Sequence, residues 1–172
     1  MTRKFVLTGG PSTGKTTLVQ ALKQEGHQVM EEVARQIMES EKINYMSLSR
    51  MERMNFQIKV FIKQLELEGR LSKQKAAFLD RGIPDCIAYC RLGGFDPPRE
   101  LVEASKRNRY DKVFLLQMLP DYETDSIRKE DAETARKIHN HIRDVYKELG
   151  YEVIEIPPVS VRERIHFIKK HI

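Results

Sequence analysis

A glycine-rich segment near the N-terminus constrains this chain more than any other part of it. Residues 9–16 read Gly-Gly-Pro-Ser-Thr-Gly-Lys-Thr, which satisfies the pattern G-x-x-x-x-G-K-[ST] in full. The apolar run Lys4–Thr8 precedes this segment, and Leu18, Val19 and Leu22 follow it at helical spacing. A strand, a glycine-rich loop and a helix in this order predict a phosphate-binding loop.

The chemistry of such a loop suggests a role for each of its residues. Glycines let backbone N–H groups converge on the β-phosphate, and the N-terminus of the following helix adds partial positive charge. We expect Lys15 to reach the β- and γ-phosphates and to be catalytic, and the Thr16 hydroxyl to ligate Mg²⁺. The residues expected to bind the nucleotide are therefore Gly9, Gly10, Pro11, Ser12, Thr13, Gly14, Lys15, Thr16 and Thr17.

The length and composition are those of an ordinary soluble domain. The chain has 172 residues, of which 40% are hydrophobic and 32% charged. We therefore expect a single domain over residues 1–172. No apolar run reaches transmembrane length, and residues 1–4 lead into the first strand without an apolar signal region. These features favour a cytoplasmic location.

The net charge of +5 raises the question of nucleic-acid binding. Lys and Arg residues are interspersed with Asp and Glu, and no basic run with interleaved aromatic residues is present. A site for phosphate groups would account for part of the positive charge. Nucleic acid is therefore not favoured as the main partner.

Apolar runs alternate with helical patterns along the rest of the chain. Further strands are predicted at residues 27–30, 76–80, 112–116 and 152–156, with helical segments between them. This alternation predicts an α/β fold with a parallel sheet, right-handed crossovers and helices on both faces.

A long helix is predicted after Ser49, because Ser49 and Glu52 form a capping-box pattern. Apolar side chains recur along it and are expected to face the core: Met51, Met54, Ile58, Phe61, Ile62 and Leu65.

Candidate catalytic residues follow the predicted strands, where parallel sheets bind their ligands. Asp80 directly follows the third apolar run, the position of a carboxylate that orients Mg²⁺ or its water shell. Arg81 could hold a substrate phosphate or hydroxyl. The structural alternatives are a turn at the strand end for Asp80 and a surface ion pair for Arg81.

Two acidic residues, Glu31 and Glu32, end the second strand. A carboxylate there can accept the proton of a substrate hydroxyl that attacks the γ-phosphate. Only one of the pair can point into the cleft, because neighbouring side chains in an extended chain face opposite ways. Arg35 lies one helical turn further on and could clamp an anionic substrate or pair with the glutamates.

Residues 119–132 form a polar segment without clear periodicity, which we interpret as a lid. A closing lid can deliver arginine to the transferred phosphoryl group while it excludes water. Arg128 within this segment is a candidate for catalysis and nucleotide binding, and Arg136 on the following helix is a candidate for substrate binding. His139 and His141 on that helix show no metal-binding pattern and are expected at the surface or cleft rim.

Several blocks of sequence together resemble a family of small P-loop ATPases and kinases. Relatives of that family include the ribosylnicotinamide kinase domain of the bacterial NAD-regulatory protein and, more distantly, deoxynucleoside and thymidylate kinases. The resemblance spans nearly the whole chain. The blocks are G-G-P-S-T-G-K-T-T-L, E-E-V-A-R, F-L-D-R-G-I-P-D, Y-D-K-V-F-L-L, R-K-E, Y-K-E-L-G-Y and I-P-P.

The resemblance implies a P-loop fold with strand order 2-3-1-4-5. It places Asp80-Arg81 at an acidic-basic pair after the third strand and Glu31 or Glu32 at the position of the kinase base. It also places Arg128 in the lid and Pro157 beside the purine. The aspartate and aromatic residues that ribosylnicotinamide kinases offer to nicotinamide have no clear counterpart in this sequence.

These observations lead to two functional hypotheses. The first is a kinase that uses ATP and Mg²⁺ to phosphorylate a small nucleoside-like or nucleotide-like acceptor. The alternative is a nucleotide-dependent switch, or a slow ATPase or GTPase, that acts on a protein or membrane partner. Residues 116–120 lack the N/T-K-x-D block of many GTP-binding folds, which favours ATP. The sequence leaves a monomer and a homodimer equally open.

Overall fold

The computed structural model describes residues 2–119 and 132–172. Five parallel strands form one sheet in the order β2-β3-β1-β4-β5. The sheet confirms the predicted fold class and strand order. The strands are β1 (Lys4–Thr8), β2 (Gln28–Met30), β3 (Ala77–Asp80), β4 (Lys112–Leu116) and β5 (Val153–Ile156).

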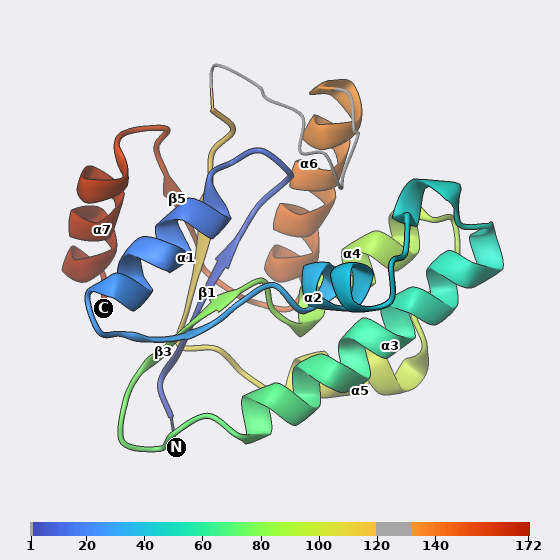
Figure 1. Ribbon diagram of the computed structural model, residues 1–172, viewed down its shortest axis with the longest axis horizontal. Coiled ribbons are helices and arrows are strands. Elements are labelled where there is room, and N and C mark those ends of the chain that lie inside the picture. The colour runs from blue at the N-terminus through green and yellow to red at the C-terminus, as the bar shows by residue number, and fades with distance from the viewer. Residues whose placement is uncertain (1, 120–131) are drawn as a thin grey trace.

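Helices connect the strands and cover both faces of the sheet (Figure 1). A short 3₁₀ helix, Tyr45–Ser47, precedes the longest of them. The α-helices are α1 (Lys15–Gln24), α2 (Val33–Ser40), α3 (Arg50–Gly69), α4 (Ile83–Leu92), α5 (Arg99–Arg107), α6 (Ala132–Glu148) and α7 (Val161–Lys170).

Alternation along the strands divides the core into two layers. Phe5 and Leu7 on β1 pack with α1 and α7, which lie together on one side of the sheet in Figure 1. Val6, between them, belongs to the larger cluster formed with α2 to α6 on the other side. The period of two residues therefore assigns neighbouring side chains of one strand to opposite layers.

Helix α3 begins where its sequence predicts, but its buried face differs from the predicted one. Ser49 and Glu52 form the expected capping box. Met51 and Ile62, however, are 62% and 59% exposed, so their predicted burial is wrong. The buried side chains are Phe61, as predicted, together with Phe56, Gln57, Val60 and Gln64, which the apolar pattern did not include. Two of these are glutamines with hydrogen-bonding partners inside the protein, which a purely apolar pattern does not detect.

The sheet brings the glycine-rich loop and the end of β3 together. Leu7 on β1 lies beside Asp80 on β3 in the parallel register. The backbone N–H of Arg81 then donates to the Leu7 carbonyl at 3.0 Å, although β3 has ended. Arg81 has a φ of 73°, in the left-handed region that a non-glycine residue adopts only at some cost in energy. This bend sets the direction in which the Arg81 side chain leaves the sheet.

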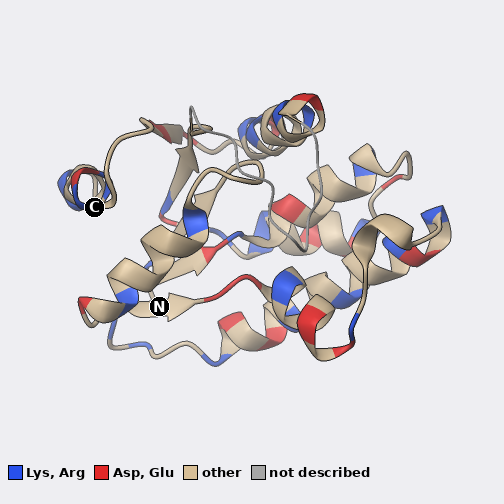
Figure 2. Ribbon diagram, turned by 45° about the horizontal axis from the view of Figure 1, so that its top comes forward, with Lys and Arg blue, Asp and Glu red and all other residues tan. Residues whose placement is uncertain are grey.

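Charges are mixed over the molecule. Figure 2 shows Lys and Arg interspersed with Asp and Glu along the helices, as the sequence indicates. Among the described residues, none of the helices combines the length and the apolar character needed to span a membrane.

Candidate active site

The glycine-rich loop connects β1 to α1 and packs closely against its neighbours. Gly9 and Gly14 have φ angles of 136° and 77°, which favour glycine. A Cβ atom on Gly9 would lie 2.8 Å from the Leu116 carbonyl oxygen, and one on Gly10 would lie 2.8 Å from the Ala135 carbonyl oxygen. The loop is therefore enclosed by the end of β4 and by α6, and bulkier residues would not fit at these positions.

Lys15 is buried at the start of α1, and its side chain crosses the loop. Its Nζ donates to the Gly10 carbonyl at 2.5 Å, to the Gly9 carbonyl at 3.1 Å and to Thr13 Oγ1 at 3.1 Å. Thr16 and Thr17 follow it and are exposed. An ammonium group held within the loop and an exposed threonine next to it are an arrangement that suits phosphate and a divalent cation.

Asp80 lies at the end of β3 with a buried carboxylate. Its Oδ1 atom is buried and has no hydrogen-bond partner among the described residues. Burial raises the pKa of Asp80, and the positive charges of Lys15, Arg81 and Arg35 oppose that rise. A buried carboxylate oxygen without a donor beside Lys15 suits a cation, so Asp80 and Thr16 fit the Mg²⁺ that the fold implies.

Arg81 is the centre of a buried network of charges. Its Nε donates to Glu32 Oε1 at 2.9 Å and its Nη1 donates to Asp85 Oδ1 at 3.0 Å. The same Nη1 donates to the Gly9 carbonyl at 3.2 Å. The guanidinium also lies 5.4 Å from the centroid of the Tyr89 ring. Arg81 is thus held in one orientation between the glycine-rich loop and α4.

The structure separates the two glutamates after β2. The Glu32 side chain is 5% exposed and pairs with Arg81. The Glu31 side chain is 43% exposed and accepts hydrogen bonds from Lys23 at 2.8 Å and Gln20 at 3.2 Å, both on α1. Both hydrogen bonds lower the pKa of Glu31, and the one from Lys23 has the larger effect. Of the two candidates, Glu32 alone belongs to the buried charge network.

A pocket lies beside this network and is lined by residues of α2, α3 and α4 and of the segments that precede these helices. The three helices are neighbours in Figure 1. The pocket holds about 580 Å³ of space not filled by atoms, part of which opens to solvent. Glu32, Arg81 and Asp85 form its charged wall, and most of the remaining lining is apolar or aromatic. That remaining lining is Val33, Ala34, Met38, Tyr45, Met46, Phe56, Gln57, Val60, Gln64, Gly82, Cys86 and Tyr89.

The structure does not bring every predicted residue to this pocket. Arg35 on α2 is half-buried and acts on Asp80 through its charge. Arg136 on α6 and Pro157 after β5 are both exposed, and neither lines the pocket. Arg128 and most of the predicted lid, residues 120–131, lie outside the described residues.

Asp85 is a buried residue of the site that sequence reasoning missed. It accepts hydrogen bonds from Thr8 Oγ1 at 2.6 Å, Tyr146 Oη at 2.7 Å and the Gly82 N–H at 3.0 Å, in addition to the one from Arg81. Its place in the first turn of α4, after the bend at Arg81, is a signal that could have indicated a capping role.

Of two basic residues beside the glycine-rich loop, sequence reasoning placed one wrongly and missed the other. His139 on α6 is buried, which corrects its predicted place at the surface or cleft rim. Arg164 on α7 is buried as well, and its Nη1 donates to the Thr13 carbonyl at 2.7 Å. Both residues come from helices far along the chain, and no local sequence pattern connects them to the loop.

A known protein family matches nearly the whole chain. A family profile described as an AAA domain matches residues 4–164. The chain belongs to this AAA-domain family. A search of curated proteins finds no match to it.

Solved structures share the fold of this AAA-domain protein. NadR in complex with NAD and AMP-PNP superimposes with a TM-score of 0.75 at 20% identity, over 99% of this chain and 49% of NadR. The AAA-domain protein thus spans about half the length of NadR.

Two kinases match over nearly their whole length. Deoxyadenosine kinase from M. mycoides, with dCMP and dCDP bound as products, has a TM-score of 0.68 at 16% identity, over 98% of this chain and 97% of the kinase. Thymidylate kinase from Ehrlichia chaffeensis has a TM-score of 0.63 at 15% identity, over 99% of both chains. At these identities the likeness establishes the fold.

Proposed function

We propose that this AAA-domain protein is a kinase that transfers the γ-phosphate of ATP to a hydroxyl group of a small, nucleoside-like acceptor. One observation carries the proposal. Arg81 Nη1 bonds the Gly9 carbonyl at 3.2 Å while Arg81 Nε holds Glu32 in the pocket wall. A single side chain therefore links the phosphate loop to a pocket with a charged wall and a mostly apolar lining. A switch or a simple ATPase has no need of such a pocket.

The loop is suited to hold the triphosphate. Its backbone N–H groups and Lys15 supply the positive potential that a polyphosphate needs. Among the described residues, no three His, Cys, Asp or Glu side chains are grouped to hold a metal by themselves. Thr16 and Asp80 would hold Mg²⁺ together with the phosphates, and the bound ion would neutralise charge on the β- and γ-phosphates.

Glu32 is suited to act as the general base. The acceptor hydroxyl oxygen would attack the γ-phosphorus, and the bond from that phosphorus to the oxygen bridging it to the β-phosphorus would break. ADP would leave, and the hydroxyl proton would pass to the Glu32 carboxylate. Arg81 fixes the orientation of Glu32 through the 2.9 Å hydrogen bond, so the base would be in place before the acceptor binds.

The pocket lining favours a planar acceptor. Tyr45 and Phe56 have ring centroids 5.3 Å apart, and Tyr89 lies near them. Aromatic rings bind a flat base by stacking and edge contacts. The Gln57 and Gln64 side chains supply amide groups in the same wall. The M. mycoides deoxyadenosine kinase, which carries dCMP and dCDP as products, supports an acceptor of this class.

Charge in the pocket favours an acceptor without a phosphate group. The charged lining residues are Glu32, Asp85 and Arg81, and Arg81 already pairs with both carboxylates. A phosphomonoester would bring about two negative charges to this wall. We therefore propose a neutral or cationic hydroxyl compound as the acceptor, rather than a nucleoside monophosphate.

The test is ADP release by the purified protein with Mg·ATP, alone and with a panel of acceptors. The panel contains neutral nucleosides, the cationic ribosylnicotinamide and nucleoside monophosphates, and mass spectrometry identifies the product. A saturable increase with one unphosphorylated compound supports the proposal. Lys15→Ala should abolish the increase, whereas Lys73→Ala, at an exposed position, should retain it. A slow rate that no compound changes favours the nucleotide-dependent switch.

A further inference from the structure

We propose that Arg164, on the C-terminal helix α7, is part of the nucleotide site and that a phosphate group of the bound nucleotide neutralises its buried charge. The inference rests on the proposed binding of nucleotide by the glycine-rich loop. It adds a residue that lies outside the loop motif and about 150 positions after it.

Arg164 is in direct contact with the loop. Its Nη1 donates to the Thr13 carbonyl at 2.7 Å, and a Cβ atom on Gly14 would lie 3.0 Å from the same nitrogen. The residue is only 2% exposed. Helix α7 is fixed on α1 by Ile165 and Ile168, which pack in the same cluster as Leu18 and Leu22. The guanidinium is therefore positioned by the core and not by a mobile surface chain.

The guanidinium lacks the partners that a buried charge requires. Its Nε and Nη2 atoms are buried and have no hydrogen-bond partner among the described residues. Arg81 is similarly buried but pairs with both Glu32 and Asp85. Burial lowers the pKa of Arg164, yet an arginine remains charged in proteins. A buried cation without an anion is costly, so a guanidinium that lacks one among the described residues points to a bound anion as its partner.

The missing partner has a definable chemistry. Two unsatisfied N–H-bearing nitrogens of a planar fork match an anion with several oxygen acceptors, and phosphate is such an anion. The loop that Arg164 touches is itself a phosphate-binding loop by sequence and conformation. Moreover, the Thr13 carbonyl belongs to the same peptide unit as the Gly14 N–H. A donor on that carbonyl polarises the peptide and strengthens the N–H as a phosphate donor.

The decisive variant is Arg164→Met, which retains most of the side-chain volume and removes the charge. Without nucleotide, its melting temperature should equal or exceed that of the wild type, because an uncompensated charge is gone. With Mg·ADP, its affinity should fall about tenfold or more, and its thermal shift should shrink accordingly. Arg162→Met is the matched control, since Arg162 lies on the same helix and is exposed. It should change neither quantity.

Three ligands distinguish a loss of phosphate binding from a loss of base binding in Arg164→Met. ADP and inorganic tripolyphosphate should both lose affinity for Arg164→Met, whereas adenosine should bind as it does to the wild type. Arg164→Lys, which keeps the charge but not the fork, should bind ADP with intermediate affinity. Titration calorimetry and thermal melting supply both readouts.

Other outcomes overturn the inference. Full ADP affinity in Arg164→Met would make the residue purely structural. Equal loss of adenosine affinity would assign it to the base instead of a phosphate. If Arg164→Met does not fold, Arg164→Lys decides the test, and full ADP affinity in Arg164→Lys overturns the inference. If the wild type itself binds no nucleotide, the proposed function fails first, and that result is distinguishable because it needs no variant.

Discussion

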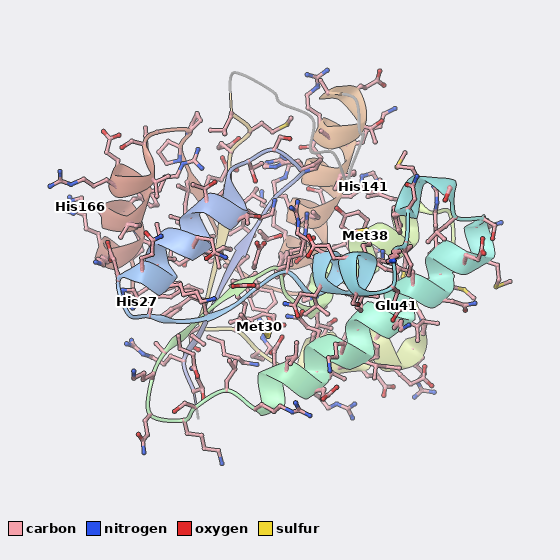
Figure 3. The ribbon with its side chains drawn as sticks, viewed as in Figure 1. His27, Met30, Met38, Glu41, His141 and His166 are labelled. Carbon is pink, nitrogen blue, oxygen red and sulfur yellow. The ribbon has the colours of Figure 1, made fainter. Side chains whose placement is uncertain are left out.

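The Nδ1 atom of His139 accepts a hydrogen bond from the backbone N–H of Gly10 at 3.2 Å. This contact joins α6 to the glycine-rich loop, 129 positions away in the sequence. His27, His141 and His166, labelled in Figure 3, are half-buried or exposed, whereas His139 is buried. Only a neutral imidazole can accept at Nδ1, so the contact requires His139 to be unprotonated.

The first prediction concerns pH. Burial lowers the pKa of His139, the charges of Lys15 and Arg143 lower it further, and Glu155 opposes them. Below the ordinary histidine pKa of about 6.5, the unfolded chain therefore binds more protons at this residue than the folded protein does. The stability that His139 contributes is present above that pH and is lost as pH falls toward the folded-state pKa. Urea unfolding at pH 7.5 and pH 5.5 should show this loss.

The matched variant is His139→Asn, whose amide oxygen can still accept from Gly10 but does not titrate. The difference in unfolding free energy between the two pH values should be smaller for this variant than for the wild type. An equal difference in both proteins would show that His139 does not titrate in this range.

The second prediction distinguishes the two glutamates after β2. Glu32→Gln should lower kcat by roughly 10²–10⁴-fold, the usual contribution of a general base. Its KM for ATP should change little, because Glu32 lines the acceptor pocket and lies outside the loop. Glu31→Gln changes the same charge one residue earlier, and it should leave kcat within about twofold, since an exposed pair with Lys23 contributes little. Equal effects of both variants would contradict the assignment of Glu32 as the base.

The third prediction concerns the stability of the network around Arg81. Asp85→Ala should lower the unfolding free energy by about 3–5 kcal/mol, because it leaves the buried Arg81 charge with one partner fewer. Tyr146→Phe removes only one of the donors to Asp85 and should cost about 1 kcal/mol. Chemical denaturation measures both. A cost for Asp85→Ala no greater than that of Tyr146→Phe would mean that the pair with Arg81 adds nothing.

The fourth prediction concerns the metal. Asp80→Asn should raise the Mg²⁺ concentration for half-maximal activity by about 10–100-fold, because the buried Oδ1 would no longer carry charge toward the cation. Asp96→Asn, at an exposed position after α4, is the control and should behave as the wild type. An unchanged Mg²⁺ dependence in Asp80→Asn would assign Asp80 to the structure of the strand end.

Secondary structure could be predicted because it depends on local patterns, whereas the strand order was implied only by the resemblance to P-loop kinases. The capping box of Ser49 and Glu52 gives the start of α3 correctly. The inward face of α3 could not be predicted from apolar residues, because Gln57 and Gln64 are buried with hydrogen-bonding partners on other segments. A pattern that scores hydrophobicity treats such residues as exposed and assigns the helix face wrongly.

The sequence by itself determined the phosphate loop, the parallel sheet and the position of Asp80 and Arg81 at its edge. Each of these follows from residues that are neighbours along the chain, where glycine conformation and periodicity act directly. Only the tertiary structure showed that Glu32, and not Glu31, belongs to the buried charge network, and that Asp85 joins it. The tertiary structure also brought His139 and Arg164 to the glycine-rich loop. Those contacts depend on the packing of α4, α6 and α7 against the sheet, and the free energy of burying a charge or a hydrogen bond is set by neighbours that a linear pattern does not contain.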